Sequence, residues 1–525
     1  MTRQPLFQQH QIQQIVVTAA EMREVEARIF AAGMPVAALM EKVAIAIVQR
    51  IAELYPAPMQ VGILVGSGHN GGDGLVVARE LHFRGYAVSV YCCSTQFKEL
   101  TGYHANYCQS LGIPFIEQVA ALQNCNLLID ALFGIGLARQ LSTDLVALIN
   151  QVNTWMKPVI SIDLPSGLQT DTGQPLGTAI QATHTLCLGL WKQGLLQDQA
   201  LKFVGKAELI DFDVPLADVL AVVGELPKVR RITTDSAIAH LPLQRPATAH
   251  KYTMGHLLLV CGSRQYAGAA ILAGLGARAS GVGMLSIAVP ESLKPILIAQ
   301  LPEALIVGCA ETELGAIAHL PMDDLESYNA IACGPGLTSD AGAVVQCVLD
   351  SDRPLLLDAD GLNYLASAGA IPTLQSRSAA TILTPHWGEF NRLFPDLADN
   401  PTCRIATTQQ AAAQTGAIVL LKGAHTIIAD SHITWINPDS TPALARGGSG
   451  DVFTGLLSGL LAQHSASNVH PPTPLASSLS PLTSLVQSAT WWHSQAGILA
   501  AQERTELGVD AYTLTQYLSQ IWRVV

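Results

Sequence analysis

Short apolar runs alternate with amphipathic stretches along the N-terminal part of the chain. A helix is predicted to start after Thr18, because Thr18 and Glu21 have the spacing of a capping box, and a second helical pattern covers about residues 35–54. The strand-like apolar runs cover residues 61–65, 87–92, 127–133, 159–162, 185–188 and 208–212. Continuous apolar strands separated by helices predict a parallel sheet that helices cover on both faces.

This pattern breaks near Gly224. Residues 225–250 are polar and contain three prolines, which is typical of a linker. Strand-like runs then resume over residues 255–260, 285–289, 330–333, 355–358, 380–383 and 418–421. We therefore expect two α/β domains, residues 1–224 and residues 230–525. The last third is expected to be helical, with an exposed Ser- and Pro-rich loop over residues 465–484.

Composition supports packed domains. The chain has 525 residues, which is too long for one hydrophobic core, and it is 49% apolar and only 13% charged. The net charge of −12 argues against nucleic acid or an anionic membrane as a general partner. An anionic nucleotide can still bind locally, through backbone N–H groups at a helix N-terminus.

The cysteines and the N-terminal residues indicate the cellular compartment in which the protein is expected. The ten cysteines include no Cys-x-x-Cys pair, so we expect free thiols of a reducing compartment rather than disulfides or zinc ligands. The first residues carry no apolar signal-peptide core, and no apolar run reaches the ~18–20 residues of a spanning helix. We therefore expect a cytoplasmic protein without a membrane partner.

A glycine-rich segment, residues 66–74, follows the first strand of the predicted sheet. Its Gly-x-Gly-x-x-Gly pattern is also found in dinucleotide-binding folds, but the next strand ends at Ser94 without the acidic residue that holds a ribose there. The interpretation as a nicotinamide-dependent dehydrogenase is thereby weakened. A P-loop is excluded because no Lys-Ser/Thr follows the glycines. Two interpretations remain: backbone N–H groups that face an anion, or glycines that serve only a tight turn.

Polar residues end the following strands. Asp130 precedes a second glycine turn at residues 134–136, and Asp163 is followed by Ser166. Each aspartate alone could be a cap. Because the carboxyl ends of parallel strands meet in one crevice, three such strand ends together predict a binding site.

A second group of polar motifs lies in the C-terminal half. Residues 446–457 place glycines and Asp451 at a predicted helix start, where N–H donors and the helix dipole attract an anion. Asp451 is positioned to accept a proton from a hydroxyl that attacks a phosphoryl group, or it is only the helix N-cap. Three further strands end in polar residues that support a nucleotide site, at 357–363, 384–390 and 421–426.

The N-terminal motifs at residues 69–74, 128–130, 134–137 and 163–167 resemble the signature of the NAD(P)H-hydrate epimerase family, over about residues 15–222. The resemblance implies a Rossmann-like three-layer domain. It implies that the hydrated nucleotide contacts His69, Asn70, Gly71, Gly72, Asp73, Gly134, Ile135, Gly136, Leu137, Ala138, Arg139, Gln140 and Asp163. It also implies potassium ligands at Asn70, Asp130 and Ser166. His69 departs from the family pattern, which usually has Asn there.

The implied chemistry is physically reasonable. Hydration of the nicotinamide ring puts a hydroxyl on a carbon next to nitrogen, and that carbon can lose and regain the oxygen. Inversion therefore needs a held ring and acid/base help. Asp130 and Asp163 are candidates for this role, and we expect Asp163 to handle the proton because Asp130 is implied to bind the metal.

The C-terminal motifs resemble the ribokinase-like fold and, within it, the ADP-dependent NAD(P)H-hydrate dehydratase family, over residues 230–525. Residues 250–251, 262–270, 334–337 and 492–493 also match. The resemblance implies that Ala269, Gly336, His386 and Asp451 contact the hydrated nucleotide and that Lys422, Gly423, Ala424, His425, Thr426 and Gly450 contact the adenine nucleotide. It makes Asp451 the catalytic base. The departures are Trp387, where Pro is usual, and Ser440-Thr441, where Gly-Asn is usual.

Together the two resemblances imply a bifunctional enzyme of metabolite repair. The N-terminal domain would interconvert the R and S epimers of hydrated NADH or NADPH. The C-terminal domain would phosphorylate the S form with ADP and Mg²⁺ and release phosphate and AMP, because phosphate leaves more readily than hydroxide. A homo-oligomer is expected. The rival interpretations are a small-molecule kinase with a nucleotide-binding N-terminal domain and a nucleotide-binding protein without turnover.

Overall fold

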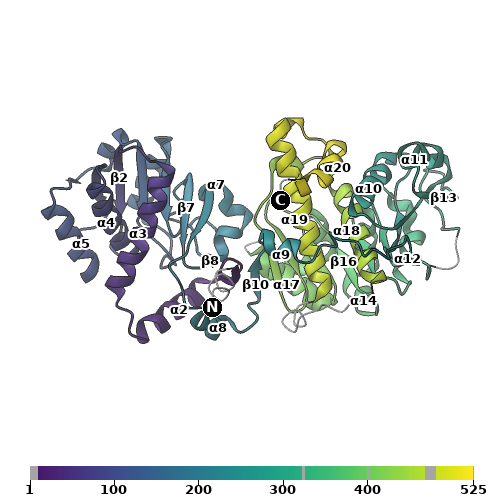
Figure 1. Cartoon of the computed structure of the whole chain (residues 1–525), viewed down its shortest axis with the longest axis horizontal. Coiled ribbons are helices and arrows are strands. Elements are labelled where there is room, and N and C mark those ends of the chain that lie inside the picture. Colours follow the sequence, from purple (N-terminus) through teal and green to yellow (C-terminus); the bar gives the residue numbers. More distant parts are fainter. Residues whose placement is uncertain (1–9, 322–324, 399–402, 468–479, 524–525) are drawn as a thin grey trace. The chain divides into compact units, whose positions relative to one another are not determined.

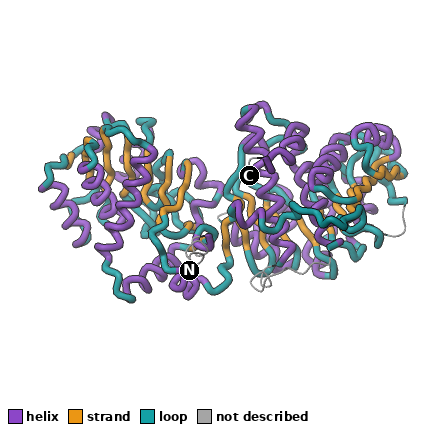
Figure 2. Tube along the Cα trace, in the orientation of Figure 1, coloured by secondary structure: helices purple, strands orange, loops and turns teal. Residues whose placement is uncertain are grey.

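The computed structural model describes residues 10–321, 325–398, 403–467 and 480–523, and the chain divides into two compact units, Met1–Val229 and Arg230–Val525. In each unit strands form a central sheet with helices packed against it (Figures 1 and 2). Among the described residues, no helix is both long enough and apolar enough to cross a membrane.

The N-terminal unit contains a seven-stranded sheet in the order β4-β3-β2-β5-β6-β7-β9, and every pair in it is parallel. The strands are β2 (Gln60–Val65), β3 (Ala87–Cys92), β4 (Phe115–Ile116), β5 (Leu127–Ala131), β6 (Val159–Ile162), β7 (His184–Leu188) and β9 (Lys206–Ile210). A separate pair joins β1 (Val16–Val17) to β8 (Trp191–Lys192). The principal helices are α2 (Ala19–Ala31), α3 (Val36–Leu54), α4 (His69–Phe83), α5 (Glu99–Ser110), α6 (Thr143–Thr154) and α8 (Leu216–Val223), and α7 (Leu201–Val204) is a single turn.

Both faces of this sheet are buried. Val61, Ile63 and Val65 of β2 belong to one apolar cluster, whereas Leu64 belongs to a second cluster that includes residues of α6. Alternate side chains of one strand therefore pack into different cores, which explains the continuous apolar runs in the sequence. The capping box at the start of α2 is confirmed, since the side chains of Thr18 and Glu21 each bond the other's backbone N–H.

The C-terminal unit contains a ten-stranded sheet in the order β10-β19-β18-β17-β16-β15-β14-β11-β12-β13. Its strands are β10 (Val229–Arg231), β11 (His256–Val260), β12 (Met284–Pro290), β13 (Leu305–Cys309), β14 (Ala330–Cys333), β15 (Leu355–Leu357), β16 (Thr381–Leu383), β17 (Ile418–Leu421), β18 (Thr426–Ala429) and β19 (Thr434–Asn437). The strands from β13 to β17 are parallel, and β18 and β19 extend the sheet as antiparallel neighbours. The α/β fold class predicted for both halves is confirmed.

The helices of this unit pack against the sheet and against one another. They are α9 (Thr234–Ile238), α10 (Ala267–Ser280), α11 (Lys294–Gln300), α12 (Gly342–Leu349), α13 (Asp360–Ala368), α14 (Ala370–Gln375), α15 (Trp387–Leu393), α16 (Pro395–Ala398), α17 (Arg404–Thr415), α18 (Ser449–Ala466), α19 (Pro481–Arg504) and α20 (Ala511–Gln520).

Two sequence predictions need correction. The polar linker contains structure, because β10 joins the sheet through β19 and Thr233 caps α9 with its side chain. The predicted loop over residues 465–484 is shorter at both ends, since α18 continues to Ala466 and α19 begins at Pro481. Thr483 and Ser484 are buried in α19, so the serine and proline content alone wrongly predicted an exposed loop at these residues. The remainder of that loop, residues 468–479, lies outside the described residues.

Helices α10 and α18 approach so closely that two glycines lie at their contact. A Cβ on Gly455 would lie 1.8 Å from the carbonyl oxygen of Ala273, and a Cβ on Gly276 would lie 2.1 Å from that of Val452. This contact holds the first turns of α18, which carry Asp451, against α10.

We predict that Gly455→Ala lowers the free energy of unfolding by about 1–3 kcal/mol, because the added methyl group must push two helix backbones apart. Thermal unfolding of the full chain measures this change. Gly268→Ala, at an exposed position of α10 with nothing within 4 Å of the added Cβ, is the control and should be neutral or stabilising. Equal stability of the two variants would contradict the close helix contact.

Candidate active sites

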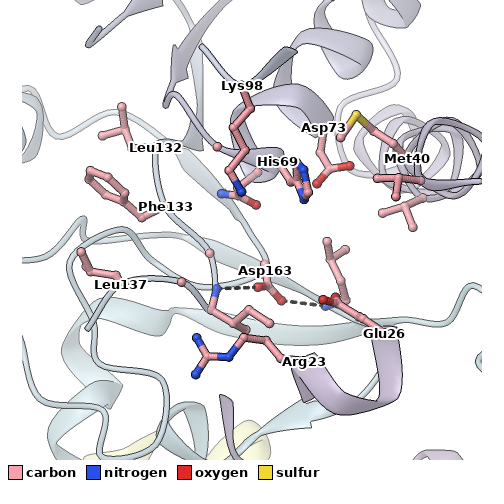
Figure 3. Close-up of a pocket in the computed structure, with 18 of the residues that line it drawn as sticks. Arg23, Glu26, Met40, His69, Asp73, Lys98, Leu132, Phe133, Leu137 and Asp163 are labelled. Atoms are coloured by element: carbon pink, nitrogen blue, oxygen red, sulfur yellow. Dashed lines mark hydrogen bonds between the residues drawn. The ribbon is translucent and has the colours of Figure 1, made fainter. Parts of the chain in front are cut away.

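The N-terminal unit has a pocket of about 690 Å³ at the carboxyl end of its parallel sheet. Segments that follow β2, β5, β6 and β7 line it, together with side chains of α2 and α3 (Figure 3). The sequence predicted that the ends of these strands meet in one crevice, and in the structure they line one pocket. Its volume lies within the range of small-molecule sites.

The first glycine segment belongs largely to a helix rather than a loop. Helix α4 begins at His69, with Gly68 as its N-cap, and His69, Asn70 and Asp73 line the pocket. Gly71 and Gly72 do not line it. A Cβ on Gly71 would lie 2.0 Å from the carbonyl oxygen of Gly66, so this glycine serves the close approach of two backbone segments.

The second glycine segment lies across the same pocket. Gly134, Ile135, Gly136, Leu137, Ala138 and Arg139 all line it, whereas Gln140 is exposed and does not. A Cβ on Gly134 would lie 2.9 Å from Asp163 Oδ2 and 3.4 Å from Asn70 Oδ1. The missing side chain thus lets this segment pass close to two of the predicted site residues.

Asp163 is held in the pocket by a buried ion pair. Lys192 Nζ lies 2.6 Å from Asp163 Oδ1, and the backbone N–H of Ile135 donates to Oδ2 at 3.2 Å. The two side chains are 1% and 8% exposed. Burial opposes the charge on Lys192, but the carboxylate of Asp163 outweighs it, and the pKa of Lys192 is raised. Asp163 also has a φ of 69°, an uncommon conformation for a residue with a side chain.

Asp130 and Ser166 lie together behind this pocket. Asp130 is fully buried and accepts the hydroxyl of Ser161 at 2.8 Å, the hydroxyl of Ser166 at 2.6 Å and two backbone N–H groups. Burial raises the pKa of Asp130, and these hydrogen bonds oppose the shift. No hydrogen bond within the described part of the chain joins Asn70, the third predicted metal ligand, to this pair, and Asn70 Nδ2 is buried without a partner.

The pocket also contains charged residues that sequence reasoning missed. Arg23 and Glu26 project from α2, Lys98 precedes α5, and Lys192 belongs to β8. Lys192 alone carried a signal, because a lysine inside the apolar stretch 185–196 needs a buried carboxylate as its partner.

In the C-terminal unit, Asp451 lies in the first turn of α18. The N-cap of this helix is Gly448, with a φ of 90°, so Asp451 is not the cap. Burial raises the pKa of Asp451 to about 6; Asp358 and Asp360 add to the shift, and Lys422 opposes it. A carboxyl with this pKa can exchange a proton near neutral pH.

A second buried aspartate–lysine pair lies beside this turn. Lys422 Nζ is 2.6 Å from Oδ1 of Asp358, and the Thr454 hydroxyl donates to Oδ2 at 2.7 Å. Asp358 is 2% exposed. A Cβ on Gly450 would lie 3.5 Å from Lys422 Nζ. Three of the predicted residues, Lys422, Gly450 and Asp451, are thus brought together.

The turn from Lys422 to Thr426 joins β17 to β18. Arg404 of α17, which was not predicted, donates from its buried guanidinium to the carbonyl oxygens of Lys422 at 2.9 Å and His425 at 3.2 Å. Gly423 and Ala424 lie in this turn, and Thr426 is the first residue of β18. The arginine therefore fixes the backbone of the segment predicted to hold the adenine nucleotide.

The remaining predicted residues lie on neighbouring segments. Gly336, with a φ of 64°, touches Ala269, since a Cβ on it would lie 2.9 Å from that of Ala269. His386 caps α15: its Nδ1 accepts the backbone N–H of Glu389 at 3.2 Å, and its side chain is 57% exposed. Trp387, one of the departures from the family pattern, stacks on Phe390 at 5.6 Å between ring centroids.

His493 supports α18 from behind. Its Nε2 lies 3.1 Å from the carbonyl oxygen of Ser449, and burial lowers the pKa of His493 to about 4. The imidazole is therefore neutral near pH 7 and donates to this carbonyl. Thr441, in the second departure, caps a short 3-10 helix, Pro442–Leu444, through its side chain.

Comparisons with known proteins agree with this architecture of two α/β units, each with its own candidate site. Residues 257–520 match the NAD(P)H-hydrate dehydratase family, and residues 36–194 match the family described as YjeF-related protein N-terminus. The bifunctional NAD(P)H-hydrate repair enzyme Nnr of Synechocystis sp. is 52% identical over 506 residues, covering 96% of this chain and 94% of that protein. The enzyme of the same name from Thermosynechococcus vestitus is 47% identical and covers 96% of each chain.

The chain is also similar to a solved structure. The ADP/ATP-dependent NAD(P)H-hydrate dehydratase from Bacillus subtilis, co-crystallized with ATP/Mg²⁺, is 33% identical and covers 56% of this chain and 97% of its own, with a TM-score of 0.45.

The class of protein is thus a two-unit α/β enzyme with a candidate site in each unit. Because these sequence identities extend over 96% of the chain, the chain belongs to the family of bifunctional NAD(P)H-hydrate repair enzymes. The resemblance seen in the sequence motifs is confirmed.

We predict that Lys192→Met destabilises the N-terminal unit by about 3–5 kcal/mol, because it leaves the buried carboxylate of Asp163 without its counter-charge. Urea denaturation measures this change. Lys206→Met is the matched control: its pair with Glu208 is at the surface, with the lysine 68% exposed, and its loss should change stability by no more than about 1 kcal/mol. A Lys192 variant as stable as the control would contradict the ion pair.

Proposed function

We propose that this chain repairs hydrated NAD(P)H in two steps. The N-terminal unit interconverts the R and S epimers, and the C-terminal unit dehydrates the S epimer to NAD(P)H with ADP, giving AMP and phosphate. The observation that carries this proposal is the 52% identity to a bifunctional NAD(P)H-hydrate repair enzyme over 96% of the chain. Both sites contain the polar groups that the two reactions need.

The N-terminal pocket suits the epimerase step. Its two glycine segments bring backbone close to a bound dinucleotide, and Lys98 and Arg139 supply positive charge for phosphate groups. Apolar residues such as Phe30, Met40 and Leu132 exclude water from part of the pocket. Ionised Asp163 lies where a ring that loses its hydroxyl becomes positively charged, so it favours that transition state over the neutral substrate.

A potassium site at Asn70, Asp130 and Ser166 is part of this proposal. All three residues carry oxygen atoms, which hard cations prefer. The buried, unpartnered Nδ2 of Asn70 is consistent with an amide turned so that its oxygen faces a cation. A bound ion would add positive charge beside the phosphate-binding side of the pocket.

The C-terminal unit suits phosphoryl transfer. Ionised Asp451 accepts the proton of the ring hydroxyl as that oxygen attacks the terminal phosphoryl group of ADP. Lys422 and the first N–H groups of α18 lie beside it and attract the transferred phosphate. Magnesium would enter with ADP and neutralise its phosphate charge. The phosphorylated ring then loses phosphate and regains its double bond.

The two activities complement one another in one chain. A dehydratase that accepts only the S epimer would leave the R epimer behind, and the epimerase converts that remainder into substrate. We further propose a homo-oligomeric assembly, which light scattering of the purified chain tests.

We predict that Asp451→Asn lowers the rate of dehydration by about 100- to 10,000-fold, because the amide cannot accept a proton. The assay follows reduced nicotinamide formed from the S epimer and ADP. Interconversion of the epimers by the same variant is the internal control and should be unchanged. Dehydration at a near-normal rate would contradict the role of Asp451.

The pH dependence of dehydration follows from the same residue. The raised pKa of about 6 means that Asp451 is an available base above this pH and is protonated below it. We predict that kcat/KM for the S epimer is level above about pH 6 and falls about tenfold per unit below it. A profile that stays level well below this pH would show that another group takes the proton.

A further inference from the structure

Three carboxyl groups share the N-terminal pocket. Asp73 projects from α4, Glu26 from α2, and Asp163 from the segment after β6 (Figure 3). The mechanism above uses only Asp163. Inversion of a carbon that bears a hydroxyl also needs a proton donor, since hydroxide is a poor leaving group.

Asp163 is the wrong group to donate that proton. Its Oδ1 accepts from the Lys192 ammonium at 2.6 Å and from the N–H of Leu188, and its Oδ2 accepts from the N–H of Ile135, so both oxygens already serve as acceptors. Burial raises the pKa of Glu26 as well, and Asp163 adds to the shift, but the nearby cations Lys192 and Arg23 oppose it.

Asp73 differs from both. In the described part of the chain it has no hydrogen bond and no ion pair. Burial, followed by repulsion from Asp163 and Glu26, raises its pKa well above the ordinary value. A raised pKa favours the protonated carboxyl, which is the form that can donate a proton to a leaving hydroxyl.

We propose that Asp73 is the general acid of the epimerase and Asp163 its general base. This inference rests on the epimerase function proposed above. The resemblance to the family implied only that Asp73 touches the hydrated nucleotide. The structure adds that Asp73 has no hydrogen bond or ion pair among the described residues and that burial and two neighbouring carboxyl groups raise its pKa.

The carbon–oxygen bond breaks, its electron pair leaves with the oxygen, and that oxygen takes the proton of Asp73 and departs as water. The lone pair of the ring nitrogen forms a carbon–nitrogen double bond, which leaves the ring positively charged. Water then adds to the other face of the carbon and gives a proton to Asp163. The product is the other epimer, and the two carboxyl groups return to their starting states by proton exchange with solvent.

Other charged groups line the same pocket as Asp73. They are Arg23 and Glu26 from α2, His69 from its own helix, Lys98 ahead of α5, Arg139, and the Asp163–Lys192 pair. The acid form of Asp73 is present below its raised pKa and is lost above it. Epimerisation therefore slows as the pH rises through that pKa.

The test uses the full chain without nucleotide, so that the C-terminal unit does not consume the substrate. Separated R or S epimer is supplied, and its interconversion is followed by chromatography and corrected for the rate without protein. We expect Asp73→Asn to slow interconversion at least about 100-fold and to remove the alkaline limb of its pH profile. Asp73→Glu should restore part of the rate. Glu26→Gln, the same change of carboxyl to amide in the same pocket, should reduce the rate less than tenfold.

Urea denaturation of each variant, with the wild-type midpoint for the N-terminal unit, shows that this unit is folded, and unchanged dehydration of the S epimer with ADP shows the same for the C-terminal unit. Interconversion by Asp73→Asn at a near-normal rate, with the wild-type pH profile, would overturn the assignment of Asp73. A larger loss in Glu26→Gln than in Asp73→Asn would also overturn it and make Glu26 the acid. If the wild-type chain itself fails to interconvert the epimers, the epimerase function fails rather than this assignment alone.

Discussion

Each unit buries an aspartate at the carboxyl end of its sheet and neutralises it with one lysine. Asp163 pairs with Lys192 and Asp358 pairs with Lys422, and both nitrogen–oxygen distances are 2.6 Å. A buried carboxylate without a counter-charge costs several kcal/mol, so these lysines allow charge to persist in sites that exclude much of the water. Burial and repulsion from this fixed negative charge raise the pKa of a neighbouring carboxyl group in each unit, Asp73 and Asp451. One kind of interaction thus keeps an ion-paired carboxylate beside a carboxyl group with a raised pKa.

The two units use this arrangement for different chemistry. In the N-terminal pocket the reacting carbon lies next to a nitrogen whose lone pair expels the oxygen, so acid and base groups suffice. In the C-terminal unit the hydroxyl must be eliminated in a net dehydration. This requires a better leaving group and therefore a phosphoryl donor. Lys422 lies where it can serve both the buried Asp358 and an incoming phosphate. The close contact of α10 and α18 keeps the first turn of α18 in register with that lysine.

Much of the fold could be predicted from the sequence, because a strand buried on both faces is apolar throughout. The bounds of β3, β6 and β17 agree with the runs that predicted them. Several short strands escaped prediction. Among them are β4 and β13 at the edges of their sheets and the antiparallel neighbours β18 and β19, which have mostly polar residues between them. The linker predicted over residues 225–250 was too long for a similar reason. It contains β10, which is only three residues long and therefore leaves no recognisable apolar run.

The candidate sites were predictable only in part. Motifs placed Asp163, Lys422 and Asp451 correctly at the carboxyl ends of strands or at a helix start. Gly71 and Gly72, inferred from the resemblance as substrate contacts, lie against backbone and a methionine instead of lining the pocket. The partnership of Lys192 with Asp163 and the raised pKa of Asp73 depend on residues distant in sequence. The apolar stretch around Lys192 indicates that the lysine is buried, but no local pattern identifies its partner.

The most direct test of two cooperating sites in one chain supplies the purified R epimer together with ADP and Mg²⁺ and follows the absorbance of reduced nicotinamide. The R epimer yields product only after inversion in one unit and dehydration in the other. The account predicts full recovery of NAD(P)H from the R epimer with the intact chain. Recovery no faster than the spontaneous inversion of the R epimer, with rapid turnover of the S epimer in the same assay, would contradict it.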